Sequence, residues 1–148
     1  MSPTGAAAAF AFVAGLGGAL QIAVQARLGE RVGTLGALAC AGVVAAATAT
    51  LLLFLAQRNL HSLGKALWGP KWLLLGAVMS AVIVLSITVA GPRIGVVATT
   101  ALLIAGQFVF ATVIDRLGLF GVERVAIGWP RLVGLLLLAV GAALTLRR

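Results

Sequence analysis

Residues 72–114 read WLLLGAVMSAVIVLSITVA-GPR-IGVVATTALLIAGQFVFATVI, which is two long apolar runs separated by Gly91-Pro92-Arg93. Neither run contains Asp, Glu, Lys or Arg. Crossing the hydrocarbon core of a bilayer takes about 20 residues of helix, and each run supplies about that many. The apolar residues are continuous rather than alternating, which is typical of membrane helices and not of barrel strands. We therefore predict two transmembrane helices joined by a tight turn.

The same pattern extends over the rest of the chain. Of its 148 residues, 62% are hydrophobic and only 9% are charged, and the mean hydropathy is +1.18. An ordinary soluble domain is about half apolar. We therefore predict an all-α integral membrane protein, with a single membrane domain over residues 1–148 and no soluble domain. The five expected transmembrane helices cover residues 5–28, 34–56, 72–90, 94–114 and 131–146.

The basic residues are divided almost evenly between the two sides of the membrane. Five spans place six of them on the side of the N-terminus: Arg58, Lys65, Lys71, Arg116, Arg124 and Arg131. The other five lie on the opposite side: Arg27, Arg31, Arg93, Arg147 and Arg148. An excess of Lys and Arg on one side orients a membrane protein, and here there is almost none. We therefore predict dual topology and an antiparallel homodimer of ten helices. The chain itself shows no convincing internal repeat. Two copies of opposite orientation would together form the inverted repeat that is typical of secondary transporters.

The net charge of +8 does not indicate nucleic-acid binding. The basic residues stand singly or in pairs at span ends, without a basic stripe or interleaved aromatic residues. Anionic membrane lipids are the partners that this distribution favours. The only cysteine, Cys40, lies inside a span, and the only histidine, His61, lies in a loop, so no disulfide or metal site is expected. No catalytic motif is present, and we expect neither a cofactor nor enzyme activity.

Polar side chains on two spans are candidates for substrate binding. Gln21 and Gln25 are four residues apart and share one helix face. Their amides would line a cavity or form interhelical hydrogen bonds, and Gln21, the deeper of the two, favours the cavity. Thr100 and Gln107 are seven residues apart and share a face, with Thr99 adjacent. An amide in hydrocarbon needs a partner, so Gln107 must meet protein, water or ligand.

The three carboxylates, Glu30, Asp115 and Glu123, all lie at span ends or in loops. A transporter of bulky hydrophobic cations usually has a buried carboxylate as counter-ion, and this chain has none. Asp115 ends its span at the unfavourable pole of the helix dipole, so we expect a basic partner, either Arg116 or a group across the dimer. The alternative for Asp115 and Glu30 is a role in proton coupling.

Two glycines of the last span, Gly134 and Gly141, are seven residues apart and lie on nearly the same helix face. Small residues let two membrane helices approach closely, so this face is a candidate for dimer packing. The alternative is that the glycines have no special role, because the chain contains 19 of them.

Residues 90–121 resemble the signature of the bacterial YdcZ family, also called the domain-of-unknown-function 606 family, of the drug/metabolite transporter superfamily. The residues that carry the resemblance are Thr99-Thr100, Gln107, Asp115 and Leu119-Phe120-Gly121, with Gln21, Trp72 and the final GLLLLAVGAAL extending it. The resemblance implies a five-helix half-transporter, which in this family occurs as single chains, as paired genes of opposite orientation and as fused ten-helix proteins. One departure is Ile22, where the family commonly has Asn.

Together these features predict a secondary-active transporter in the bacterial inner membrane that moves a small polar or amphipathic solute by alternating access. Its site is expected near the bilayer midplane, lined by Gln21 and Gln107 of both copies, with Thr100 nearby. The alternatives are a dual-topology passive channel, a non-transporting membrane subunit, and a heterodimer with an inverted paralogue.

Overall fold

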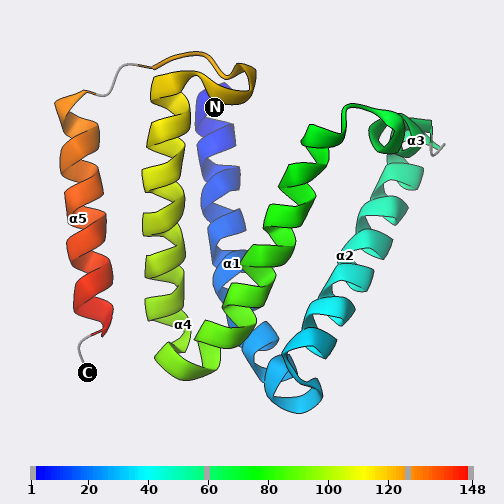
Figure 1. Ribbon diagram of the computed structural model, residues 1–148, viewed down its shortest axis with the longest axis horizontal. Coiled ribbons are helices and arrows are strands. Elements are labelled where there is room, and N and C mark those ends of the chain that lie inside the picture. The colour runs from blue at the N-terminus through cyan, green and yellow to red at the C-terminus, as the bar shows by residue number, and fades with distance from the viewer. Residues whose placement is uncertain (1–2, 59–60, 126–127, 147–148) are drawn as a thin grey trace. The chain divides into compact units, whose positions relative to one another are not determined.

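A computed structural model describes residues 3–58, 61–125 and 128–146, and all the regular structure in these ranges is helical (Figure 1). Four long helices and three short ones follow one another along the chain. They are α1 (Pro3–Val32), α2 (Thr34–Gln57), α3 (His61–Trp68), η1 (Lys71–Leu74), α4 (Leu75–Leu117), η2 (Leu119–Gly121) and α5 (Trp129–Leu146). The connection between the second and third expected spans, residues 57–71, therefore contains the short helix α3.

Within the described parts of the chain, four stretches of helix are long and apolar enough to cross a membrane: Thr4–Val32, Thr34–Gln57, Lys71–Leu117 and Trp129–Leu146. The expected third and fourth spans both lie in α4. A straight helix of its 43 residues would be about 65 Å long, roughly twice the thickness of a hydrocarbon core. The α4 path is not continuous, however, because Gly95 has the non-helical dihedral angles φ 83° and ψ 166°.

The expected turn at Gly91-Pro92-Arg93 is therefore displaced along the chain. Pro92 lies inside the helical path, and the interruption comes at Gly95. Proline removes one backbone donor and disfavours a continuous helix around it, but it does not by itself supply a turn. The turn needs a residue that accepts positive φ, and glycine does so without steric cost.

The chain forms two compact units that share α1 and α4. The first comprises residues 1–22 and 94–148, so it holds the start of α1, the part of α4 after Gly95, and α5. In this unit the second part of α4 and α5 run antiparallel (Figure 1). The second unit comprises residues 23–93, with the end of α1, the helices α2 and α3, and the first part of α4.

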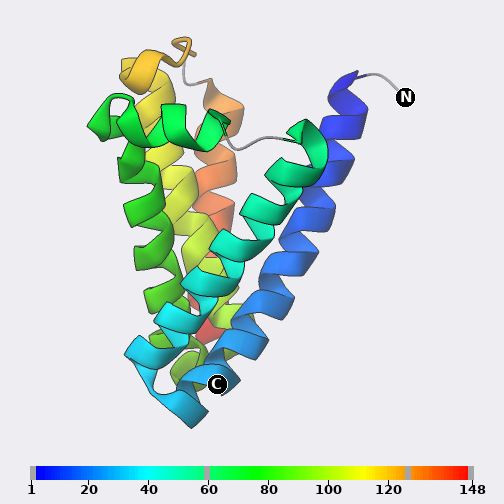
Figure 2. The ribbon, with the colours of Figure 1, turned by 90° about the vertical axis from the view of Figure 1, so that its right-hand side faces the viewer.

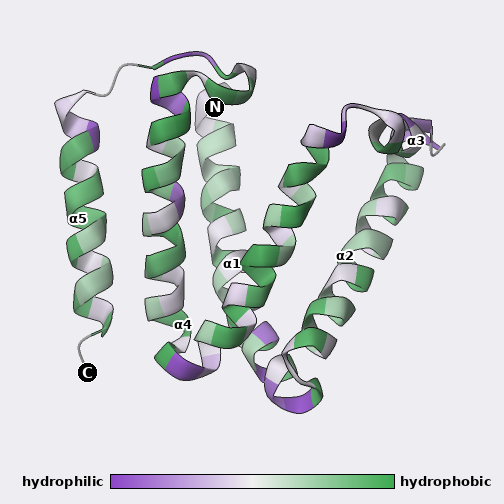
Figure 3. Ribbon diagram, viewed as in Figure 1, coloured by the Kyte–Doolittle hydropathy of each residue, from purple (hydrophilic) through white to green (hydrophobic). Residues whose placement is uncertain are grey.

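Apolar side chains cover the outside of the helices, and very few are buried. The buried apolar residues are Ile22, Ala26, Ala37, Ile87, Ala98 and Ala142, most of them small. Large side chains such as Phe10 and Leu137 are exposed. Figure 2 shows the helices turned by 90° from the view of Figure 1. Hydrophobic residues extend along the helices, while hydrophilic residues lie mainly at helix ends and connections (Figure 3). This distribution suits helices surrounded by lipid tails, which are as apolar as leucine.

Two short segments of the chain share a local motif that ends in a glycine of the same conformation. Residues 29–33 read GERVG and residues 91–95 read GPRIG, each with an exposed arginine in the middle. Both closing glycines have nearly the same dihedral angles, φ 79° and ψ 160° at Gly33 and φ 83° and ψ 166° at Gly95. This region of φ/ψ space is essentially restricted to glycine. The two motifs thus build the same local interruption, at the end of α1 and within α4.

Replacing Gly95 with Ala is expected to destabilise the protein by about 1–3 kcal/mol, because a side chain is strained at these dihedral angles. Nothing lies within 4 Å of a Cβ built there, so the effect comes from the backbone and not from a clash. Gly106→Ala is the matched control: Gly106 is helical and equally open, so alanine should be neutral or stabilising by up to about 1 kcal/mol. Thermal unfolding in detergent measures both, and equal midpoints would contradict the prediction.

Candidate functional site

The unit formed by residues 1–22 and 94–148 contains a pocket of about 470 Å³ between α4 and α5. The α4 residues that line it all follow the interruption at Gly95, and Ala19 of α1 completes the wall. The remaining lining residues are Val96, Val97, Thr100, Ala101, Ile104, Leu137, Leu138, Gly141, Ala142 and Thr145. The pocket lies beside the beginning of the second α4 segment and the second half of α5, and its wall is apolar apart from two hydroxyl groups.

Those two hydroxyl groups belong to Thr100 and Thr145. Thr100 is half-buried, and its Oγ1 donates a hydrogen bond to the Val96 carbonyl oxygen at 2.8 Å. Thr145 is exposed, and its Oγ1 donates to the Ala142 carbonyl oxygen at 2.7 Å. We expected Thr100 as a site residue but did not expect Thr145. Its signal is visible in the sequence, since it is the only uncharged polar residue of the last apolar run.

Thr99 lies beside the pocket without lining it. It is buried, with 2% of its surface exposed, and its Oγ1 donates to the Gly95 carbonyl oxygen at 2.8 Å. The bond spans one turn back to the glycine that interrupts α4. Thr99 therefore contacts the first turn of the second α4 segment, and in this chain its hydroxyl supports the backbone there.

Gln21 and Gln107 both lie in this unit, and both side chains are exposed in the single chain. Among the described residues, neither amide has a hydrogen-bond partner, and neither lines the pocket. Transferring an amide out of water without such a partner costs about 2–7 kcal/mol, depending on the reference state. Both residues lie within apolar helices, where an amide without a partner is costly.

Gln25 has a different environment in the unit formed by residues 23–93. It is buried, and its Nε2 donates to Thr88 Oγ1 of α4 at 3.1 Å. Thr88 in turn donates to the Val84 carbonyl oxygen at 2.8 Å. Gly29 lies so close that a Cβ there would approach the Thr88 methyl group to 2.5 Å. Gln25 thus forms part of a tight contact between α1 and α4, which is the structural alternative considered for this amide.

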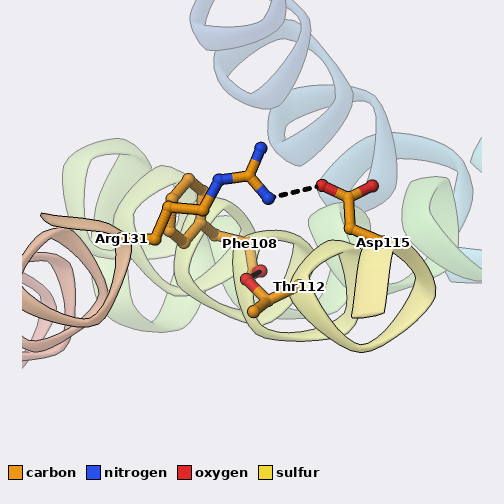
Figure 4. Close-up of polar contacts among 4 residues, drawn as sticks. All are labelled: Phe108, Thr112, Asp115 and Arg131. Atoms are coloured by element: carbon orange, nitrogen blue, oxygen red, sulfur yellow. Dashed lines mark hydrogen bonds and ion pairs between the residues drawn. The ribbon is translucent and has the colours of Figure 1, made fainter. Parts of the chain in front are cut away.

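Asp115 at the end of α4 pairs with Arg131 at the start of α5, with 2.8 Å between Oδ2 and Nη1 (Figure 4). Within the chain, the partner is Arg131 and not the expected Arg116. Adjacent helical residues do not face one another, so Arg116 points elsewhere. The connection between α4 and α5 folds back, with Val125 N–H donating to the Asp115 carbonyl oxygen at 3.0 Å, and this brings α5 to the carboxylate.

The connection begins with a left-handed residue that ends α4. Gly118 has φ 64°, and its N–H donates to the Ile114 carbonyl oxygen at 2.8 Å. A Cβ at Gly118 would meet the Arg124 side chain at 2.6 Å. The Leu119-Phe120-Gly121 turn follows directly. These residues of the family-like signature therefore build the cap of α4 and the return to α5.

The remaining candidates occupy exposed positions. Glu30 pairs with Arg27 of the same helix at 3.1 Å. At Gly134 and Gly141 no described neighbour lies within 4 Å of an added Cβ, so there is open space beside both glycines. Their role in dimer packing remains a prediction. Among the described residues, no three His, Cys, Asp or Glu side chains are grouped as metal ligands.

Replacing Arg131 with Gln is expected to lower the free energy of unfolding by about 1 kcal/mol, because Asp115 would lose its partner at the negative pole of the α4 dipole. Arg27→Gln is the matched control, since its pair with Glu30 is more exposed, at 83% and 47% against 40% and 28% for Arg131 and Asp115. Its effect should be close to zero. Equal destabilisation of the two variants in detergent would contradict a structural role of the Asp115 pair.

Comparison with known protein families identifies the family of the chain. The family model described as "Putative inner membrane exporter, YdcZ" matches residues 6–144, which is nearly the whole chain. No curated protein and no solved structure matches. The match confirms the resemblance seen in residues 90–121, and the family is one of transporters rather than enzymes. The chain therefore belongs to the YdcZ family, and it is a multi-pass protein of the inner membrane that serves in membrane transport.

Proposed function

We propose that the protein is a half-transporter that pairs as an antiparallel homodimer and moves a small polar or amphipathic solute by alternating access. The observation that carries this proposal is the exposure of Gln21 and Gln107 in apolar helices, with no hydrogen-bond partner for either amide among the described residues. A second copy, a bound solute and water in a cavity between the copies can each supply polar partners at this depth. The family description supports export as the direction.

Five crossings per chain are supported by the interruption of α4. Residues 75–94 and 96–117 lie on either side of Gly95, and each segment is about 30 Å long as a helix. That length matches one hydrocarbon core. An odd number of crossings places the two ends of the chain on opposite sides of the membrane. The two orientations of a dual-topology chain are then true inverses of each other.

The homodimer is supported by the charge distribution and by the open glycine face of α5. Six basic residues against five give the insertion machinery almost no preference. Gly134 and Gly141 leave room for a close approach of another helix. In such a pair Gln21, Gln107 and Thr100 of both copies would face a shared site near the bilayer midplane. Thr99 would stabilise the backbone next to this site through its bond to the Gly95 carbonyl oxygen. Gln25 would hold α1 against α4 through its bond to Thr88.

Alternating access follows from the symmetry of the proposed pair. When two identical chains pair antiparallel, the inward-open and outward-open states are related by the two-fold axis in the membrane plane. Their free energies are equal in the absence of a gradient. Asp115 and Glu30 each have an arginine partner, so we assign them to ion pairing rather than to proton transfer.

Labelling of single cysteines tests the orientation. In a Cys40→Ala background, one Cys is placed at Lys65 and, in a separate variant, one Cys is added after Arg148, beyond the described residues. About half of each variant should react with a membrane-impermeant thiol reagent in intact cells, and all of it after permeabilisation. Complete labelling of one variant and none of the other would mean one fixed orientation, and would exclude the homodimer in favour of an inverted partner chain.

Alanine substitution of the exposed amides tests the site. Gln21→Ala and Gln107→Ala should each slow transport about tenfold, because each removes a hydrogen bond worth roughly 1 kcal/mol or slightly more, while the dimer persists. The measurements are uptake of a panel of small polar and amphipathic solutes by proteoliposomes, and chemical cross-linking in the membrane. Gln25→Ala is the control and should mainly reduce stability. Unchanged transport with weaker cross-linking would assign the exposed amides to assembly instead.

A further inference from the structure

The pocket between α4 and α5 offers hydrogen-bond acceptors but no free donors, and this limits what it can bind. Its hydroxyl groups, from Thr100 and Thr145, both use their protons in hydrogen bonds to carbonyl oxygens of their own helices, at 2.8 Å and 2.7 Å. A hydroxyl has one proton and two lone pairs. Both oxygens therefore remain available only as hydrogen-bond acceptors. A ligand that forms a polar contact with either one must bring the donor.

The pocket also has no charge to offer. None of the residues that line it is ionisable. Asp115 and Arg131 do not line the pocket, and they already pair with each other. A cationic ligand would leave water without meeting a carboxylate, which is strongly unfavourable in apolar surroundings. An anionic ligand would find neither a basic side chain nor a free donor. Both signs of charge are therefore disfavoured, and an uncharged ligand remains.

We propose, building on the proposed transport function, that this pocket binds an uncharged, mainly apolar molecule that donates a hydrogen bond to Thr100 Oγ1, to Thr145 Oγ1, or to both. A neutral aromatic or aliphatic alcohol has this chemistry. The volume of about 470 Å³ falls within the range of roughly 300–1,000 Å³ found for small-molecule sites. The ligand would correspond to the amphipathic rather than the strongly polar end of the proposed substrates.

Two other occupants fit the acceptors less well. A lipid acyl chain would fill the apolar wall but supplies no donor to either oxygen. The described part of α5 from a second copy presents Leu, Val, Ala and Gly side chains over most of its length, and these supply none either. A donor-bearing ligand is the one of the three that complements both the apolar wall and the two hydroxyl oxygens.

Three naphthalene probes of similar size test the proposal: neutral 2-naphthol, 2-methoxynaphthalene without a donor, and cationic 2-naphthylmethylammonium. Binding to the full-length protein in zwitterionic lipid nanodiscs is measured by equilibrium dialysis at neutral pH, with empty nanodiscs subtracted. We expect saturable binding of 2-naphthol, about fivefold tighter than that of 2-methoxynaphthalene for one hydrogen bond gained. The ammonium probe should bind more weakly than 2-naphthol. Equal binding of the first two probes, or preferred binding of the ammonium probe, would overturn the proposal.

Substitutions of the two threonines locate the binding. Thr145→Val or Thr100→Val should weaken 2-naphthol binding about fivefold and leave 2-methoxynaphthalene unchanged, because Val keeps the shape and loses the oxygen. Serine at either position should restore the affinity. Thr48→Val is the matched control, since Thr48 makes the same bond to the Val44 carbonyl oxygen at 2.8 Å, away from the pocket. Loss of naphthol selectivity in the Thr48 variant, or its persistence in both pocket variants, would overturn the assignment.

The pocket and the proposed packing face share Gly141, but ligand binding and assembly are measured by separate experiments. Cysteine labelling and cross-linking of the same variants report orientation and pairing without any ligand. If 2-naphthol does not bind but about half of each cysteine variant is labelled, the ligand proposal for the pocket is rejected and the homodimer is kept. Specific naphthol binding with a single fixed orientation would keep the pocket and reject the homodimer. A fall in cross-linking with Thr145→Val, without any naphthol binding, would assign the pocket to a second copy and overturn the ligand proposal.

Discussion

The structure depends on one constraint: inside a membrane, every backbone N–H and C=O must find a partner within the protein. A helix meets this requirement along its length, so turns belong at the membrane faces. The chain uses the same device twice, ending a helical run with Gly-x-Arg-Val/Ile-Gly, whose last glycine adopts a conformation essentially closed to other residues. The arginine in the middle can reach headgroups at the same point. The same five-residue motif thus supplies the glycine that interrupts the helix and the arginine that can reach the lipid headgroups.

The same constraint distinguishes the polar side chains inside the spans. Six threonines donate to a backbone carbonyl oxygen of their own helix: Thr48, Thr88, Thr99, Thr100, Thr112 and Thr145. The Gln25 amide instead donates a hydrogen bond to Thr88 on another helix. Gln21 and Gln107 have no such solution in the single chain. In the proposed transporter these two amides meet a second copy, a bound solute or water.

The sequence predicts the helices well, because long runs without charge have no other stable form in a bilayer. Boundaries depend on finer effects: the interruption came at Gly95 rather than Gly91-Pro92-Arg93, since proline weakens a helix while glycine turns it. Tertiary partners were harder to predict. Arg131 reaches Asp115 only because the Gly118 turn folds the chain back, and the register of a loop is not visible in hydropathy. Thr145 was missed because one hydroxyl in an apolar run looks unremarkable until a second faces the same pocket.

In the proposed transporter, the distribution of charge bears on both topology and substrate. The basic residues at span ends and in loops are nearly equal in number on the two sides, so either orientation translocates almost the same number of them. The middles of the spans carry no ionisable group. The same composition leaves nothing inside to balance a charged substrate. A neutral substrate, in turn, is not driven by the membrane potential, which contributes about 2.3 kcal/mol per elementary charge and 100 mV. Two identical antiparallel chains have no built-in direction either, so net movement of such a solute would follow its own concentration gradient unless a second solute is coupled to it.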